Sequence, residues 1–183
     1  MDPVGLAVAR TGLSPNMLTA IGALGNVGAG VLAGAGMFVA AGIVMLVFSA
    51  VDLLDGAVAR ATNRATAFGS VFDATLDRVS EGAVLFGLLW FYTGEGERTE
   101  ALLVFVAATG SMLVSYIKAR AEVEGLLSRE GWLTRAERVV IMGVALITGL
   151  VTPALWLLAT GTSMTAAQRL YLTWRGLSAK GRA

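Results

Sequence analysis

Residues 52–77 read Asp52-Leu-Leu-Asp55-Gly56-Ala-Val-Ala59-Arg60, then eight residues, then Gly69-Ser-Val-Phe-Asp73-Ala-Thr-Leu-Asp77. The first two aspartates are spaced i, i+3 and the last two i, i+4, so each pair projects from one face of a helix. An ionised carboxylate near the centre of a bilayer costs about 2.5–3.5 kcal/mol, so four of them cost on the order of 10 kcal/mol unless they are neutralised. Two facing helices would bring the four carboxylates together, and two divalent cations would balance their charge. Hard oxygen ligands indicate Mg²⁺ or Mn²⁺ rather than zinc or copper.

The composition around this stretch is that of a membrane protein. Of the 183 residues 56% are hydrophobic and only 15% are charged, and the mean hydropathy is +0.72. Several apolar runs are close to the length that spans a bilayer, so we expect one polytopic membrane domain. The chain contains no cysteine and no histidine. This excludes thiolate nucleophiles and imidazole catalysis, and it leaves carboxylates as the available bases.

The hydropathy pattern predicts an all-α integral membrane protein with six transmembrane helices. A Ser14-Pro15 start precedes the first, because Ser caps helices and Pro is favoured at their first position. The expected spans cover about residues 16–34, 38–60, 66–92, 100–117, 135–150 and 152–174, and the fourth is expected to continue as a helix through Glu122 into the cytoplasm. We expect residues 1–13 to form a short interfacial segment, residues 14–176 the membrane domain and residues 177–183 a basic cytoplasmic tail.

The distribution of basic residues predicts the orientation. Of the 14 Lys and Arg residues, only Arg98 is placed on the side opposite the chain ends. By the positive-inside rule both termini face the cytoplasm, in a multi-pass protein of the cell membrane. A lipid environment is expected, and no nucleic acid is expected as a partner.

The acidic and basic residues converge at one depth. A rise of 1.5 Å per residue places all four aspartates in the cytoplasmic half of the membrane. Lys118, Arg138 and Arg169 fall near the cytoplasmic ends of the fourth, fifth and sixth spans. We therefore expect a polar cavity that opens to the cytoplasm. The metal ligands lie at its base, and Lys118, Arg138 and Arg169 form one side, which we call the cationic wall. Two metal ions held by carboxylates suit displacement at phosphorus, and the cations suit a phosphate-bearing substrate.

The complete run from Asp52 to Asp77 resembles the signature of the CDP-alcohol phosphotransferase family. Shorter patches around Lys118, Arg138 and Gln168-Arg169 resemble its phosphatidylinositol-phosphate synthase branch. The resemblance implies that the hydroxyl of inositol 1-phosphate attacks the lipid-side phosphorus of CDP-diacylglycerol. Phosphatidylinositol phosphate forms, and CMP leaves. The resemblance also makes a homodimer plausible.

The resemblance carries over to this chain position by position. The implied metal ligands, for two Mg²⁺ or Mn²⁺ ions, are Asp52, Asp55, Asp73 and Asp77. Asp77 is also the implied general base. The positions implied for binding the CDP-lipid are Asn16, Thr19, Asp52, Gly56, Arg60, Thr66 and Gly69. Those implied for the acceptor phosphate are Lys118, Arg138 and Arg169.

Other interpretations stay open from the residues alone. Glycerol 3-phosphate also carries a phosphate and a hydroxyl, so a phosphatidylglycerophosphate synthase is the nearest alternative. Intramembrane acids also mark ion paths, so a cation transporter is an alternative from another class, and a non-catalytic membrane scaffold is a third. For Glu81 we favour pairing with Arg78 or with a neighbouring helix. For three further arginines we favour anchoring at lipid headgroups; these are Arg120, Arg129 and Arg135.

Overall fold

The described part of the chain is helical. The computed structural model describes residues 14–61, 66–126 and 131–181, except for the side chains of residues 53–55, 57 and 59–61. The expected interfacial segment, residues 1–13, lies outside these ranges. The helices are α2 (Pro15–Gly34), α3 (Phe38–Ala61), α4 (Ala67–Gly94), α5 (Arg98–Val123), α6 (Arg135–Thr148) and α7 (Val151–Lys180). Each corresponds to one of the helices expected from the sequence.

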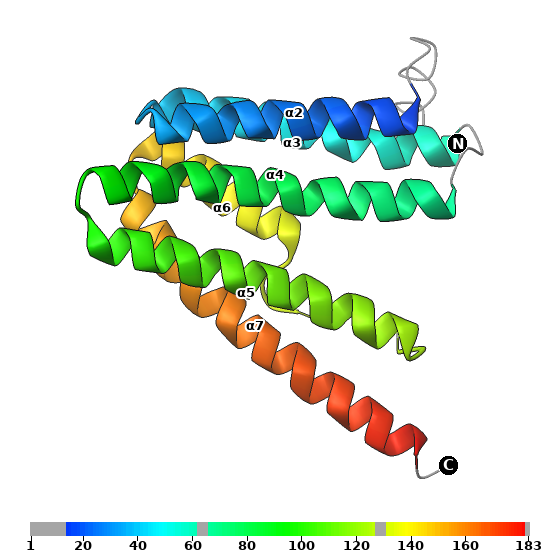
Figure 1. Cartoon of the computed structure of the whole chain (residues 1–183). Coiled ribbons are helices and arrows are strands. Elements are labelled where there is room, and N and C mark those ends of the chain that lie inside the picture. The colour runs from blue at the N-terminus through cyan, green and yellow to red at the C-terminus, as the bar shows by residue number, and fades with distance from the viewer. Residues whose placement is uncertain (1–13, 62–65, 127–130, 182–183) are drawn as a thin grey trace.

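The helices form a bundle with two distinct ends. α2, α3 and α4 run side by side, α5 packs on α7, and the short α6 packs on α3 (Figure 1). The turns that join α2 to α3, α4 to α5 and α6 to α7 lie at one end. The first residues of α2 and the last residues of α7 lie at the other end (Figure 1), where the signature aspartates are also placed.

Local sequence explains where the helices begin. The Ser14 side chain accepts a hydrogen bond from the backbone N–H of Met17, and Pro15 follows as the first helical residue. Thr66 caps α4 by accepting from the backbone N–H of Gly69. Thr134 caps α6 in a reciprocal capping box with Glu137. These caps satisfy N–H groups that have no partner within the helix.

Two helix ends differ from the expectation. α6 ends at Thr148 because Gly149 takes a left-handed conformation with φ of +78°, which few other residues adopt readily. α7 continues to Lys180, beyond the expected end near residue 174, and so includes part of the expected tail. The Lys180 Nζ donates to the carbonyl oxygens of Glu124 and Gly125, at 3.0 and 3.1 Å. This contact fastens the end of α7 to the end of α5.

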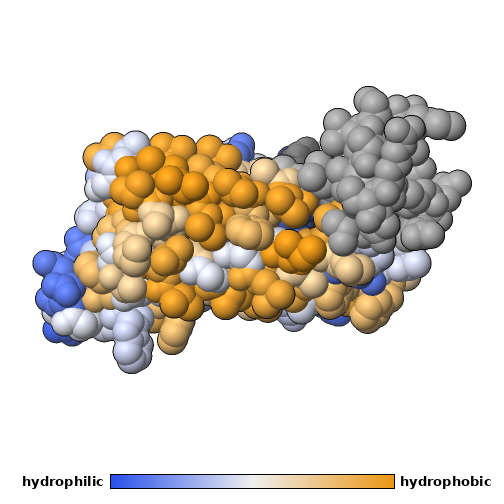
Figure 2. All heavy atoms as spheres, turned by 90° about the horizontal axis from the view of Figure 1, so that it is seen from above, coloured by the Kyte–Doolittle hydropathy of each residue, from blue (hydrophilic) through white to orange (hydrophobic). Residues whose placement is uncertain are grey.

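The outer surface is strongly apolar between the two ends of the bundle. Figure 2 shows a broad hydrophobic face, with hydrophilic residues gathered toward one end. Exposed side chains include Leu24 (72%), Val31 (69%) and Trp90 (68%). Among the described residues, two helices are long and apolar enough to cross a membrane by length and composition, Pro15–Gly34 and Arg98–Val123. A surface of this kind suits hydrocarbon rather than water.

Small residues allow α2 and α4 to touch backbone to backbone. A Cβ on Gly87 would overlap the carbonyl oxygen of Gly30, and a Cβ on Gly30 would overlap the carbonyl oxygen of Ala83. Close approach of this kind is how transmembrane helices gain packing energy without a hydrophobic driving force. The contact fixes α4, which carries Asp73 and Asp77, against the rest of the bundle.

Candidate active site

A cavity of about 450 Å³ lies among α4, α5, α6 and α7. Its acidic side chains come mainly from α4, and its basic side chains come from all four helices. The lining includes Asp73, Asp77, Arg78, Glu81, Lys118, Glu122, Arg135, Arg138 and Arg169. The polar cavity expected from the sequence is therefore present in the structure.

Carboxylates of α3 and α4 meet at one edge of this cavity. Asp52, Asp73 and Asp77 each offer an oxygen, and these oxygens lie within 4.8 Å of one another. Asp52 is 6% exposed and is packed by α2, because a Cβ on Gly22 would lie only 3.0 Å from the Asp52 Cβ. Three hard oxygen donors at this separation suit Mg²⁺ or Mn²⁺. The side chain of Asp55, the fourth predicted ligand, lies outside the described residues.

Arg135 lies in the carboxylate cluster, so the expectation that it anchors to lipid headgroups was wrong. Its Nη1 lies 2.7 Å from the Asp77 Oδ1, and its Nη2 lies 3.1 Å from the Asp52 Oδ2. Packing of α6 on α3 brings the first residue of α6 to this position. One signal was present in the sequence: Arg135 is spaced i, i+3 from Arg138, so a helix presents both on one face.

Arg138 is buried and firmly paired. Its Nε and Nη2 donate to the two carboxylate oxygens of Glu81 at 2.6 and 2.8 Å, and its Nη1 donates to the carbonyl oxygen of Leu133 at 3.2 Å. The Ser111 hydroxyl donates to the same carboxylate at 2.9 Å. Glu81 thus pairs with a neighbouring helix, as expected, whereas the part of Ser111 was not foreseen.

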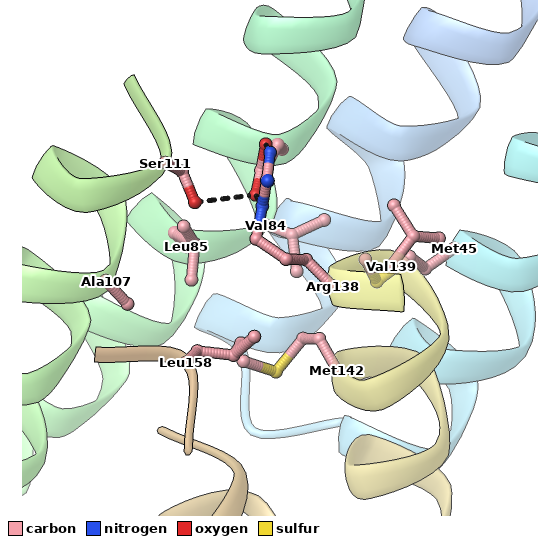
Figure 3. A pocket seen from close by; sticks show the side chains of 10 residues that line it. Met45, Val84, Leu85, Ala107, Ser111, Arg138, Val139, Met142 and Leu158 are labelled. Carbon is pink, nitrogen blue, oxygen red and sulfur yellow. Dashed lines mark hydrogen bonds and ion pairs between the residues drawn. The ribbon is translucent and has the colours of Figure 1, made fainter. Parts of the chain in front are cut away.

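The Glu81–Arg138 pair rests on an apolar layer. Figure 3 shows Ser111 and Arg138 directed to the same place above side chains that include Leu158 and Met142. The small cavity here has a volume of about 10 Å³, which leaves space for about one water molecule. A buried arginine whose three nitrogens are all hydrogen-bonded keeps one orientation, since few alternative partners are within reach.

The other two predicted phosphate ligands also line the large cavity. Arg169 is 6% exposed, and its Nη1 donates to the Val114 carbonyl oxygen at 3.0 Å. Lys118 is half exposed and lies 3.8 Å from Glu122 on the same helix. Exposed pairs at this distance are weak, so Lys118 can exchange its partner easily. The structure thus brings Lys118, Arg138 and Arg169 to one wall.

Predicted CDP-lipid positions gather where α2 and α4 begin. A Cβ on Gly69 would lie 3.0 Å from the Thr66 Oγ1 and 3.3 Å from the Asn16 Oδ1, so these three residues are neighbours. Asn16 is exposed. Thr19 is buried one turn further along α2, and its hydroxyl donates to the Pro15 carbonyl oxygen at 3.1 Å. Gly56 lies within α3, while the side chain of Arg60 lies outside the described residues.

Comparison with known proteins gives consistent matches over nearly the whole chain. Residues 12–172 match the family model described as CDP-alcohol phosphatidyltransferase. A phosphatidylinositol phosphate synthase of Mycobacterium marinum is 39% identical over 94% of this chain and 79% of its own length. The enzyme of that name from Mycobacterium tuberculosis is 37% identical, over 94% and 84%.

Solved structures of the Mycobacterium tuberculosis synthase have the same fold. A structure with CDP-DAG bound superposes with a TM-score of 0.86 at 34% identity, over 94% of this chain and 92% of that one. A complex with manganese and citrate also has a TM-score of 0.86, at 35% identity over 94% and 88%.

Proposed function

Because the chain belongs to the CDP-alcohol phosphatidyltransferase family, we propose that it transfers the phosphatidyl group of CDP-diacylglycerol to inositol 1-phosphate. The products are phosphatidylinositol phosphate and CMP. The protein is an enzyme of phospholipid synthesis. The observation that carries the proposal is the cavity with carboxylates on one edge and five cationic side chains around it.

The carboxylate edge supports a pair of divalent ions. Asp52, Asp73 and Asp77 offer oxygens within 4.8 Å of one another, and Asp55 lies one turn from Asp52 on α3. A related enzyme has been solved with manganese. Mg²⁺ or Mn²⁺ bound here would stabilise charge on the attacking and leaving oxygens of a displacement at phosphorus. The aspartates would hold these ions at the depth of the bilayer.

Asp77 is our candidate for the general base. It lines the cavity from α4, one helical turn from both Asp73 and Glu81, and is 19% exposed. With no histidine in the chain, a carboxylate facing the acceptor is the group that can take the proton from the attacking hydroxyl. Glu81 is less suited, because both of its oxygens accept hydrogen bonds from Arg138.

The cationic wall supports an acceptor that bears a phosphate. Lys118, Arg138 and Arg169 come from three helices and face one cavity. Arginine grips phosphate through paired N–H groups, and burial strengthens each such hydrogen bond. We assign the acceptor phosphate to these residues. With its phosphate bound there, the acceptor would direct its hydroxyl toward Asp77, which lines the same cavity.

The neighbourhood of Asn16, Thr66 and Gly69 supports the nucleotide side of the substrate. These residues lie together where α2 and α4 begin, and the missing side chain at Gly69 leaves space at the exposed N-terminal turn of α4. Helix N-termini attract phosphate groups. We assign the CDP moiety to this end, with contributions from Thr19, Asp52, Gly56 and Arg60.

We place the enzyme in the cell membrane, with both chain ends and the cavity on the cytoplasmic side. The supporting argument is that basic residues gather at the cavity end of the bundle, where soluble nucleotide and acceptor would enter.

Exposed apolar side chains of α4 and α5, such as Phe86 and Phe105, are available for contact with lipid or with a second copy.

The test is CMP release from CDP-diacylglycerol by purified protein with Mg²⁺. Inositol 1-phosphate, glycerol 3-phosphate, serine and free inositol are compared as acceptors. The proposal expects activity with inositol 1-phosphate and little with free inositol, which lacks the phosphate. Preference for glycerol 3-phosphate would contradict the acceptor while leaving the chemistry in place. No CMP release with any acceptor would contradict the proposed reaction.

A further inference from the structure

We propose that Arg135 links the divalent-ion site to the acceptor-phosphate site. It binds Asp52 and Asp77 until a divalent ion takes their oxygens, and then it donates to the acceptor phosphate in the cavity. The inference rests on the metal and acceptor sites of the proposed function. It adds that the two ligands bind cooperatively through this one side chain.

The first step is competition for the same oxygens. Arg135 contacts the Asp77 Oδ1 at 2.7 Å and the Asp52 Oδ2 at 3.1 Å. These residues are two of the three members of the carboxylate cluster. A divalent ion and a guanidinium at the same oxygens repel each other strongly at such short range. Ion binding therefore favours release of Arg135.

The second step is that Arg135 has an unused hydrogen-bond donor. Its Nε is buried and has no hydrogen-bond partner, although 27% of the side chain is exposed and lines the cavity. Buried donors without partners are rare, because they have lost water without replacing it. Once Arg135 leaves the aspartates, an anionic oxygen in the cavity can satisfy this donor.

The third step concerns the charges that meet Arg135 when it leaves the aspartates. The cavity is also lined by Arg78, Lys118, Arg138 and Arg169. The carboxylate of Glu81 is committed to Arg138. Without an anion, four cationic side chains oppose the arrival of a fifth, whereas a phosphate makes the arrival of Arg135 favourable. The ion and the phosphate therefore favour the same rearrangement, so each strengthens binding of the other.

The direct test is Mn²⁺ titration of the purified full chain in nanodiscs, with free Mn²⁺ followed by its electron paramagnetic resonance signal. Titrations are made with and without inositol 1-phosphate, and protein-free samples correct for Mn²⁺ bound by the phosphate itself. In the unaltered protein the phosphate should tighten Mn²⁺ binding on the order of 10-fold, within the range usual for coupled sites. In Arg135→Gln, Mn²⁺ should bind several-fold more tightly without phosphate, and the phosphate effect should fall to about 2-fold or less.

Two further variants keep the test decisive. Arg120→Gln removes the same charge from an exposed arginine, 58% exposed and paired with Glu124, and should behave like the unaltered protein. Arg135→Lys retains the charge with a weaker grip on two carboxylates. It should give intermediate Mn²⁺ affinity, and it replaces the glutamine variant if that one does not fold.

The outcomes separate this inference from the proposed function. Mn²⁺ binding that is unchanged or weaker in Arg135→Gln overturns the inference alone, as does an equal gain in Arg120→Gln. Mn²⁺ affinity in the unaltered protein that ignores inositol 1-phosphate also overturns it. Failure of the unaltered protein to bind Mn²⁺ overturns the metal site of the proposed function and, with it, this inference.

Discussion

The guanidinium of Arg138 on α6 binds the carboxylate of Glu81 on α4 through two parallel hydrogen bonds, Nε to Oε1 at 2.6 Å and Nη2 to Oε2 at 2.8 Å. Arg138 is 3% exposed and Glu81 is 13% exposed. This pair joins the helix that bears Asp73 and Asp77 to the helix that bears Arg135. The pair therefore fixes the position of the carboxylates on α4 relative to the cationic side chains on α6.

Glu81→Gln should destabilise the protein and weaken acceptor binding. Breaking a buried ion pair by removing one partner costs about 3–5 kcal/mol, because the remaining charge stays buried without compensation. Thermal unfolding in detergent should show a lower midpoint, and the KM for inositol 1-phosphate should rise because Arg138 loses its fixed orientation.

The matched control is Glu122→Gln, which removes an exposed carboxylate that pairs with Lys118 at 3.8 Å. Surface pairs contribute about 0–1 kcal/mol, so its unfolding midpoint should change little. Equal destabilisation by the two variants would contradict the prediction that the buried Glu81–Arg138 pair stabilises the protein more than the exposed Lys118–Glu122 pair.

Asp77→Asn should abolish most of the CMP release. The change removes the proposed base, which contributes roughly 10²–10⁴-fold in such reactions, and it also removes a proposed metal ligand. Glu97→Gln, an exposed position at the far end of the bundle, serves as the control. A folded Asp77→Asn protein with nearly full activity would contradict the assignment.

Removal of divalent ions should stop the reaction reversibly. After treatment with EDTA, CMP release should be lost, and Mg²⁺ or Mn²⁺ should restore it, because oxygen-only sites favour these ions. Ca²⁺, which is larger and takes more ligands, should restore less activity. Activity that persists in EDTA would contradict a metal-dependent mechanism.

Gly87→Val should destabilise the bundle by forcing α2 away from α4. The new side chain would overlap the backbone of Gly30, and overpacking of this kind costs typically about 1–3 kcal/mol. Gly82→Ala on the same helix is the control, because no other group lies within 4 Å of an added Cβ there. The unfolding midpoint should fall for Gly87→Val only. A fall of the same size in both variants would argue against the close contact between α2 and α4 at Gly30 and Gly87.

Much of the site was predictable because its positions follow helical geometry. The spacing of Asp73 and Asp77 predicts one face of one helix, and hydropathy predicts which segments are helices. The start of α2 at Pro15, with Ser14 as its cap, was also predicted and is confirmed. The convergence of Lys118, Arg138 and Arg169 was predicted from depth alone, since membrane spans are nearly parallel. Their placement in one cavity is confirmed, whereas their roles stay predictions.

Contacts between helices were decided only by the tertiary structure. Arg135 looked like an arginine that anchors to headgroups, because hydropathy assigns depth and not the direction in which a side chain points. Packing of α6 on α3 turns it toward Asp52 and Asp77, at 3.1 and 2.7 Å. The hydrogen bond from Ser111 to Glu81 was likewise not foreseen, because it depends on how α5 packs on α4. The sequence by itself determined the helices and the depth of their charges, since these depend on local propensity and on burial in lipid. The rotation and crossing of the helices depend on packing among all of them, so only the folded bundle decides which charges meet.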